Sequence, residues 1–400
     1  MKRIYLDNSA TTKPDCEVVK VMEHTNSKYF GNASSIHSFG QEARKIVDQS
    51  RLDIAKILNC KPSEIIFTSG GSESDNLAIM GIIEASNIKK PHLITSEIEH
   101  HAILDTVKEL ERGGSIEATY IKPDKNGVVK AEGVEKAIKE NTVLVSIMYV
   151  NNEIGTVEPI RQIGKMIEKI NEKRLSQIDM PHTTDNGRIY FHTDAVQVPE
   201  YFDLNVEYLH LDLLTLSAHK FYGPKGIGIL YKRGDLKLKH QIIGGDQEYK
   251  LRAGTENVAA IAGMAEAFNR IKNNKLRIKK TEKLRNKLIK GLLKIPNSRL
   301  NGCKVRRSPN NLNISFKNAE GESILMMLDQ KGIAASSGSA CTSNSLEPSH
   351  VLEALGVSPK WSHGSVRFSL GKDTTSEEID KVIEVMPNII KKLREMSPLK

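Results

Sequence analysis

The most informative stretch of the sequence is Leu213-Leu214-Thr215-Leu216-Ser217-Ala218-His219-Lys220, with Tyr222-Gly223-Pro224 two residues after it. Its first four residues predict a buried strand, and a lysine follows the end of that strand. Such a lysine suits a Schiff base with an aldehyde cofactor, because burial lowers the pKa of its amine and makes it nucleophilic. Ser217 and His219 could donate to a phosphate. The alternative is a surface lysine beside a turn, and this stretch alone does not decide between the two.

Similar short apolar runs occur along the first two thirds of the chain. They predict further strands at residues 65–68, 93–95, 143–147 and 189–192, with helices at 73–86 and 102–112 between them. Strands that alternate with helices indicate a mostly parallel sheet covered on both faces. In such sheets, ligands bind beyond the carboxyl ends of the strands. The polar motifs of this sequence fall mostly at those ends.

A carboxylate follows another predicted strand, in His192-Thr193-Asp194-Ala195-Val196-Gln197. A buried Asp194 would keep the ring nitrogen of a pyridoxal cofactor protonated, which makes the ring an electron sink. Gln197 could hydrogen-bond the ring's phenolic oxygen. The alternative is that Asp194 is a turn or cap residue, the usual role of an aspartate at a strand end.

Two glycines join a strand to a helix in Thr68-Ser69-Gly70-Gly71-Ser72-Glu73-Ser74. Backbone N–H groups near Gly71, with the Ser72 hydroxyl, would form an anion site at the start of that helix. The motif is neither a Walker loop nor GxGxxG. Taken alone, it also fits an ordinary glycine turn with a serine cap.

Two further motifs follow strands 93–95 and 143–147. Glu99-His100-His101 could place the His100 imidazole on the face of a cofactor ring, and the absence of HExxH spacing argues against zinc. Asn152, in Asn151-Asn152-Glu153, could offer its amide to a ring oxygen.

Together these motifs resemble the NifS/IscS-type cysteine desulfurases, in the class V branch of fold-type-I pyridoxal-phosphate enzymes. The resemblance runs from Tyr5 to Leu399, and its most specific element is Ser336-Ser337-Gly338-Ser339-Ala340-Cys341-Thr342-Ser343. It implies an α/β fold with a mostly parallel seven-stranded sheet in a large domain, residues 15–262. A smaller α+β domain, residues 1–14 and 263–400, would carry the catalytic cysteine loop.

The resemblance also assigns roles to single residues. Lys220 would bind pyridoxal 5'-phosphate covalently, and Cys341 would be the nucleophile. Asp194 would pair with the ring nitrogen, and Gln197 and Asn152 would contact the ring-oxygen side. His100 would stack on the ring and move protons. The phosphate would be held by Gly71, Ser72, Ser217, His219 and Thr255 of the partner subunit's chain, and the substrate carboxylate by Asn32 and Arg367.

The implied reaction removes sulfur from L-cysteine, releases alanine and leaves a persulfide on Cys341. The implied partners are a second copy of the chain, in a homodimer, and an iron–sulfur scaffold or other sulfur acceptor protein. No intrinsic metal is implied, although Cys341 could transiently share the acceptor's iron–sulfur cluster. An aminotransferase or a selenocysteine lyase of the same fold is the first alternative, and an aminotransferase has no use for Cys341.

Composition and charge bound the remaining possibilities. The chain has 400 residues and a net charge of +9, with no apolar run long enough for a membrane span and no apolar signal core. We therefore expect a cytoplasmic protein. Residues 270–294 hold eleven Lys or Arg and one Glu, with a leucine at every fourth position from 284 to 292. This pattern predicts a helix with a solvated basic face or a docking surface for an acidic partner.

That basic segment contains no aromatic residues to stack on bases, which argues against a nucleic-acid-binding protein. Residues 171–188 are polar and lack a clear period, so they predict a surface loop. The cysteines Cys16, Cys60, Cys303 and Cys341 form no CxxC and suggest neither disulfides nor zinc. We expect the first three to be packed, and Cys341 to lie in a mobile polar loop.

Overall fold

A seven-stranded sheet forms the centre of the computed structural model, which describes residues 3–176, 187–271, 274–337 and 349–396. The strands run in the order β2-β8-β7-β6-β5-β3-β4, and β8 runs opposite to the other six strands. Their bounds are β2 Ile65–Thr68, β3 His92–Ser96, β4 Glu117–Ile121, β5 Thr142–Ser146, β6 Tyr190–Asp194, β7 Leu213–Ser217 and β8 Gly228–Lys232. The predicted mostly parallel sheet is confirmed, with β4 and β8 as strands that the sequence patterns did not predict.

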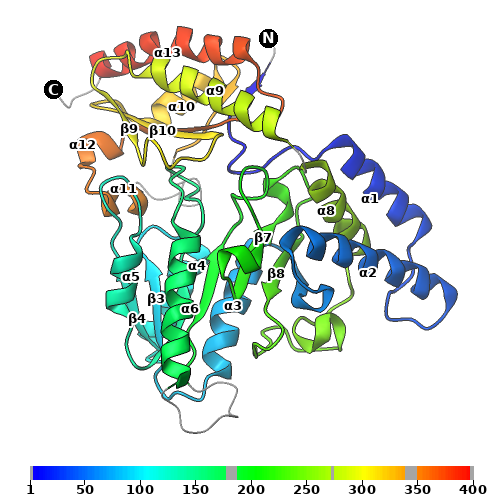
Figure 1. The fold of residues 1–400 in the computed structure, drawn as a ribbon. Helices are drawn as coiled ribbons and strands as arrows, with labels where there is room; N and C mark the ends of the chain where they lie inside the picture. The colour runs from blue at the N-terminus through cyan, green and yellow to red at the C-terminus, as the bar shows by residue number, and fades with distance from the viewer. Residues whose placement is uncertain (1–2, 177–186, 272–273, 338–348, 397–400) are drawn as a thin grey trace.

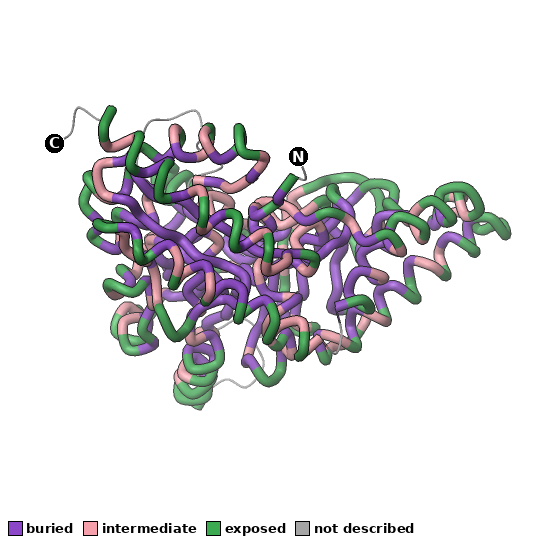
Figure 2. Tube along the Cα trace, turned by 90° about the horizontal axis from the view of Figure 1, so that it is seen from above, coloured by how far each residue is buried: buried purple, intermediate pink, exposed green. Residues whose placement is uncertain are grey.

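Helices cover both faces of this sheet (Figure 1). Alternate strand residues divide between two hydrophobic clusters: Ile66 and Leu93 pack with α3 and α4, whereas Phe67 and Ile94 pack with the helices on the other face. The covering helices are α2 Ser38–Leu58, α3 Gly71–Ala85, α4 His101–Arg112, α5 Ala131–Ala137, α6 Ile160–Ser176 and α8 Val258–Ile271. Figure 2 shows how thoroughly the interior of the molecule is buried, as expected for a sheet with two covered faces.

A smaller α+β unit lies beyond the carboxyl ends of the parallel strands (Figure 1). Its strand β10 (Asn311–Phe316) pairs antiparallel with β9 (Ser298–Asn301) and β12 (Ser365–Ser369). The helices α9 (Lys275–Leu292), α10 (Gly321–Asp329) and α13 (Ser376–Met396) pack on this sheet. The N-terminal strand β1 (Ile4–Tyr5) joins the same unit by pairing with β11 (Ile333–Ala334).

The division into residues 15–262 and residues 1–14 with 263–400 stays a prediction. The hydrophobic clusters differ from it in two places. Helix α8 continues to Ile271 within the cluster of the large sheet, and Val351 and Leu352 of α11 (His350–Ala354) belong to that cluster too. Further helices are α1 Cys16–Lys28, which packs on α8, and the short helices α7 Val206–Leu209 and α12 Pro359–Ser362.

Two sequence predictions outside the sheet have opposite outcomes. The basic segment forms helix α9, with Leu284, Leu288 and Leu292 buried as expected.

The predicted surface loop at residues 171–188 is wrong in its first part, because α6 continues to Ser176 and Asn171 is buried. The Asn171 side chain donates to the Ile189 carbonyl (2.8 Å) and accepts from its N–H (2.9 Å), so it ties the helix to the sheet. Residues 177–186 lie outside the described part.

No helix within the described ranges is both long and apolar enough to cross a membrane.

Candidate active site

A cavity of about 400 Å³ lies where the carboxyl ends of β2, β5, β6 and β7 face the smaller unit. It brings together most of the residues that the sequence motifs indicated. The predicted residues that line it are Gly71, Ser72, His100, Asn152, Asp194, Gln197, Ser217, His219, Lys220 and Arg367. The expectation that the polar motifs meet at one edge of the sheet is therefore met by the geometry.

Lys220 ends the short 3-10 helix Ala218–Lys220, which follows β7 directly. Its Nζ donates to the carbonyl oxygens of Ser9 and Ala10, each at 2.8 Å. These two carbonyls belong to the N-terminal segment of the chain. The lysine is thus held at the cavity wall by backbone oxygens, which accept from an amine without neutralising it.

Asp194 is the last residue of β6 and is 8 % exposed. Its Oδ1 accepts the Val196 N–H at 2.9 Å. Burial raises the pKa of this carboxyl to about 6, while the Val196 N–H and the positive charge of Lys220 lower it. A carboxylate in this position can pair with a protonated ring nitrogen.

The N-terminus of α3 forms one end of the cavity. Among the described residues, no side chain caps this helix, so the first-turn N–H groups near Gly71 and Ser72 are available to an anion. A Cβ at Gly71 would lie 3.1 Å from Val196 Cγ2, which shows how closely the loop approaches the β6 end. Ser217 and His219 line the same cavity, and the residue types and the uncapped helix start fit a phosphate group.

His100 is the N-cap residue of α4, and its Nδ1 accepts the Ala102 N–H at 3.1 Å. Because Nδ1 accepts this bond, the proton of the neutral ring is on Nε2. Burial, with a contribution from the positive charge of Lys220, lowers the pKa of His100 to about 4. The imidazole is therefore neutral at pH 7. His219 is similar, since burial lowers its pKa to about 4 and its Nδ1 lies 3.1 Å from Thr11 Oγ1.

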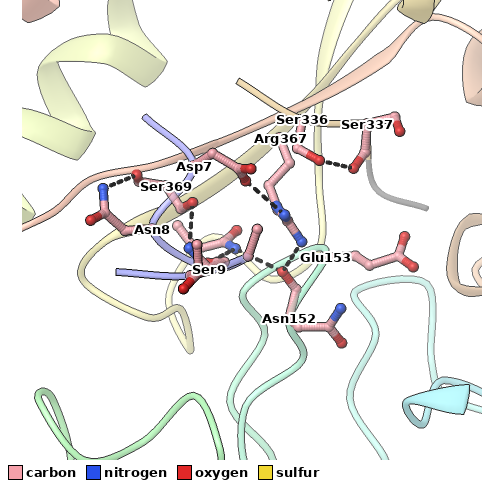
Figure 3. Close-up of polar contacts among 12 residues, drawn as sticks. Asp7, Asn8, Ser9, Asn152, Glu153, Ser336, Ser337, Arg367 and Ser369 are labelled. Atoms are coloured by element: carbon pink, nitrogen blue, oxygen red, sulfur yellow. Dashed lines mark hydrogen bonds and ion pairs between the residues drawn. The ribbon is translucent and has the colours of Figure 1, made fainter. Parts of the chain in front are cut away.

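Arg367 lies on the opposite side of the cavity, on β12, and is 2 % exposed (Figure 3). Its Nη2 donates to Asp7 Oδ1 at 2.9 Å and its Nη1 to the Asn152 carbonyl at 3.1 Å. Its Nε is buried and has no hydrogen-bond partner among the described residues. A buried guanidinium with a donor to spare fits a substrate carboxylate.

The segment that leads to Cys341 begins beside this arginine. The Ser336 N–H donates to the Arg367 carbonyl (3.1 Å), and the Arg367 N–H donates back to Ser336 (2.7 Å). Cys341 itself lies outside the described residues. Asn32 and Thr255 are exposed and do not line the cavity of their own chain.

The sequence motifs missed several residues of the cavity wall. Ser9 and Ala10 contribute through backbone carbonyls, for which a side-chain pattern carries no signal. Two buried carboxyl groups, Asp75 and Glu99, also line the cavity. Burial raises the pKa of Glu99 to about 8, although Ser96 Oγ and the Met148 N–H donate to it. Asp75 lies one turn beyond Gly71 on α3, and Glu99 directly precedes His100, so their places in the motifs could have indicated them.

The other cysteines differ in their surroundings. Cys16 is exposed at the start of α1, so the expectation that it is packed is wrong. Cys60 is half-buried, and burial raises the pKa of its thiol to about 12. Cys303 is also half-buried. Within the ranges that the structure covers, no three His, Cys, Asp or Glu side chains are grouped to hold a metal ion.

Comparisons with known proteins agree with this geometry. The aminotransferase class-V family matches residues 4–382. The chain is 47 % identical to a protein named cysteine desulfurase IscS from Methanosarcina thermophila, over all of this chain and 94 % of that protein. It is also 47 % identical to the cysteine desulfurase IscS of Clostridium botulinum, over all of this chain and 97 % of the other.

Solved structures show the same likeness. A NifS-like protein superimposes with a TM-score of 0.88 at 36 % identity, covering 98 % of this chain and all of that one. A structure described as SspA in complex with cysteine superimposes with a TM-score of 0.80 at 34 % identity, covering 94 % of this chain and all of that one. The chain therefore belongs to the cysteine desulfurases, a family of pyridoxal-phosphate-dependent enzymes within the class-V aminotransferases.

Proposed function

We propose that this chain, as a cysteine desulfurase, takes the sulfur atom from L-cysteine, holds it as a persulfide on Cys341 and releases L-alanine. The observation that carries the proposal is the cavity itself. Lys220 and Asp194 face it from the ends of adjacent strands, and Arg367 faces it from the smaller unit. This arrangement provides an amine, a ring-nitrogen partner and a carboxylate partner in one buried space.

The residues that would hold pyridoxal phosphate follow from their positions. The α3 N-terminus at Gly71 and Ser72, with Ser217 and His219, would bind the phosphate, and Lys220 would bind the aldehyde carbon. Asp194 would pair with the ring nitrogen, Gln197 and Asn152 would lie on the ring-oxygen side, and His100 would lie on the ring face. The bound cofactor supplies an electron sink for the charge that develops at the substrate α-carbon.

Arg367 would bind the substrate carboxylate with its Nε, assisted by Asn32. Lys220 would then remove the α-proton, because His100 has its Nδ1 occupied by the Ala102 N–H and its proton on Nε2. His100 is instead suited to donate that proton. This division gives the amine the role of base and the imidazole the role of acid.

The sulfur step needs a thiolate at Cys341. Its sulfur attacks the sulfur of the bound substrate, so that an S–S bond forms as the substrate C–S bond breaks. The electron pair of the C–S bond stays with the carbon, which takes up a proton and becomes the methyl group of alanine. In net terms, L-cysteine and the Cys341 thiol give L-alanine and the Cys341 persulfide.

A homodimer would complete the site. Exposed apolar side chains occur on the segments that carry the two predicted residues outside the cavity: Phe30 and Ile36 beside Asn32, and Ile243 on the segment that leads to Thr255. Exposed apolar groups of this kind favour a protein interface. In a twofold dimer, Thr255 of each chain would reach the phosphate in the other.

The persulfide must also leave the chain. An acceptor protein, such as an iron–sulfur scaffold, would take the sulfur from Cys341 and could share its cluster with that cysteine. The cytoplasmic location likewise stays a prediction.

The test is to mix the purified protein with L-cysteine and a thiol reductant, and to measure sulfide and alanine. We expect the two products in equal amounts, and none from Lys220→Ala. A keto acid formed without sulfide would indicate an aminotransferase. Turnover of L-selenocysteine without turnover of L-cysteine would indicate a selenocysteine lyase, and either result would contradict the proposal.

A further inference from the structure

Two buried carboxyl groups share the cavity wall, and the proposed reaction uses only one of them. Asp75, on α3, is 1 % exposed, and Asp194, on β6, is 8 % exposed. Both line the same cavity. Two carboxylates that are close together in a buried site disfavour each other's charge, so one of them tends to keep a proton. The surroundings of each group decide which one does so.

The neighbours of Asp194 favour its negative charge. The Val196 N–H donates to it, and the positive charge of Lys220 acts on it. The neighbours of Asp75 do not favour a charge. They are the carboxyl groups of Asp194 and Glu99, which repel a negative charge, and the His192 imidazole, whose Nε2 lies 3.7 Å from Asp75 Oδ1. The Thr215 hydroxyl from β7 acts in the other direction and lowers the pKa of Asp75, but burial and the two carboxyl groups outweigh it. Among the described residues, this Oδ1 accepts no hydrogen bond although it is buried.

The His192 imidazole does not supply a compensating positive charge. It is fully buried, with Nδ1 2.8 Å from Ser146 Oγ and Nε2 3.1 Å from Thr215 Oγ1. Burial lowers the pKa of His192 to about 3, so the ring is neutral at pH 7. The other charged group on the first turn of α3 supplies no positive charge to Asp75 either. It is the carboxylate of Glu73, which is paired with Arg252 at 2.9 Å.

We propose that Asp75 is a positioning residue for the ring-nitrogen partner: the two carboxyl groups hold one proton between them, the proton resides on Asp75, and the charge resides on Asp194. The proposal rests on the proposed role of Asp194. A neutral Asp75 fills the wall without placing a second negative charge there, and it leaves the carboxylate where the ring nitrogen needs it. Consistently, burial and the charge of Asp194 raise the pKa of Asp75 well above its ordinary value, whereas the pKa of Asp194 reaches about 6.

The pH dependence of folding tests where the proton is. A carboxyl group with a raised pKa in the folded state binds more protons there than in the unfolded chain. Its presence therefore makes the folded protein lose stability as the pH rises above the unfolded pKa of about 4 and through the folded pKa. Asp75→Asn keeps the neutral shape and removes the titration. The Tm of the variant minus that of the wild type should therefore increase by about 3 °C or more between pH 5 and pH 9.

The measurement uses the purified full-length holoprotein and needs no substrate, so it is independent of whether sulfide is formed. Asp212→Asn is the matched control. Burial raises the pKa of Asp212 too, but Arg233 (2.6 Å) and Arg188 (3.1 Å) pair with this carboxyl group. Asp212→Asn leaves both arginines without that partner, so this variant should be less stable than the wild type throughout that pH range, whereas Asp75→Asn should become the more stable protein as the pH rises. A Tm difference between Asp75→Asn and the wild type that stays constant, or falls, as the pH rises would overturn the proposal.

A spectroscopic readout guards against a variant that folds poorly. The infrared difference between the wild type and Asp75→Asn, or the smaller Asp75→Ser, should contain the carbonyl stretch of a protonated carboxyl group at pH 7. Other buried acids such as Glu99 occur in both proteins and cancel. A carboxylate band in that difference would place the charge on Asp75 and overturn the proposal. Asp75→Glu should restore the pH dependence of Tm that Asp75→Asn removes.

Discussion

Arg367 is held in place before any substrate arrives, because Asp7 and the Asn152 carbonyl occupy its two Nη atoms (Figure 3). Arg367→Lys keeps the charge and loses the planar fork, so the Nε donor and one of these anchors are lost. We expect the KM for L-cysteine to rise about tenfold or more, the equivalent of one charged hydrogen bond, with a smaller change in kcat.

Steady-state kinetics of the two proteins check this prediction. Arg306→Lys is the control, since Arg306 is an exposed arginine in the same unit and should leave KM unchanged. A KM for Arg367→Lys equal to that of the wild type would rule out Arg367 as the carboxylate partner.

Single residues could be predicted from the sequence where a polar side chain lies at the end of a buried strand or within a few residues after it. Asp194 and Lys220 are of this kind, and both line the cavity. The Ser9 and Ala10 carbonyls could not be predicted, because every residue carries such a group and only the tertiary fold brings them to Lys220. Likewise, a motif shows that Asp75 is on the helix but not which carboxyl group shares its surroundings.

At the scale of elements, β8 packs unusually close to the loop that leads into α3. A Cβ at Gly228 would lie 2.6 Å from the Leu216 carbonyl and 2.8 Å from the backbone of Gly70. Gly228→Ala should therefore push that loop outward. We expect a loss of about 1–3 kcal/mol of stability, typical of overpacking, together with weaker retention of the cofactor.

Thermal unfolding and the visible absorbance that remains after dialysis measure these two effects. Gly133→Ala is the control, because Gly133 is on helix α5 and a Cβ there has only Ile121 Cγ2 within reach, at 3.6 Å. It should be neutral or slightly stabilising. If Gly228→Ala and Gly133→Ala had the same Tm and retained the same visible absorbance, the prediction would be contradicted, because the loop would then tolerate the added Cβ.

The sequence predicted those elements whose apolar pattern is uninterrupted. Strands β2, β3, β5, β6 and β7 are of this kind. The basic helix α9 was predicted instead from its leucines at every fourth position. Strand β8 was missed because its residues Gly228–Lys232 follow a glycine-rich turn that dominates the local pattern. The end of α6 was missed because its last turns are polar, and the buried Asn171, bonded to Ile189, replaces the apolar contact that a pattern would reveal.

At the scale of the whole molecule, the dimer makes a prediction about mixed subunits. Thr255→Ala should weaken retention of the cofactor, since the proposed contact is to the partner's phosphate. Lys220→Ala should remove covalent binding in its own chain. If the two variants form a mixed dimer, one site has both defects and the other has neither.

Unfolding and refolding the two variants together should therefore restore tight cofactor binding that neither variant shows alone. Sedimentation checks that dimers form. A mixture whose cofactor retention equals the average of the two separate variants would contradict a site shared between chains.

The whole-molecule charge has a simple structural source. Exposed lysines of α9, among them Lys275, Lys279 and Lys283, project from a helix in which Leu284, Leu288 and Leu292 are buried. The sequence predicted this helix. Its three buried leucines explain how it packs, but they do not explain why its exposed face is so basic. The solvated basic face and the docking surface for an acidic partner both stay predictions.

Cys341 should carry the sulfur after turnover, and mass spectrometry of peptides measures where the added sulfur lies. The protein is treated briefly with L-cysteine, alkylated and digested. We expect one added sulfur on the Cys341 peptide, both in the wild type and in Cys16→Ala, which removes the exposed competing thiol. Added sulfur on Cys16, Cys60 or Cys303 instead, or full desulfurase activity in Cys341→Ala, would contradict it.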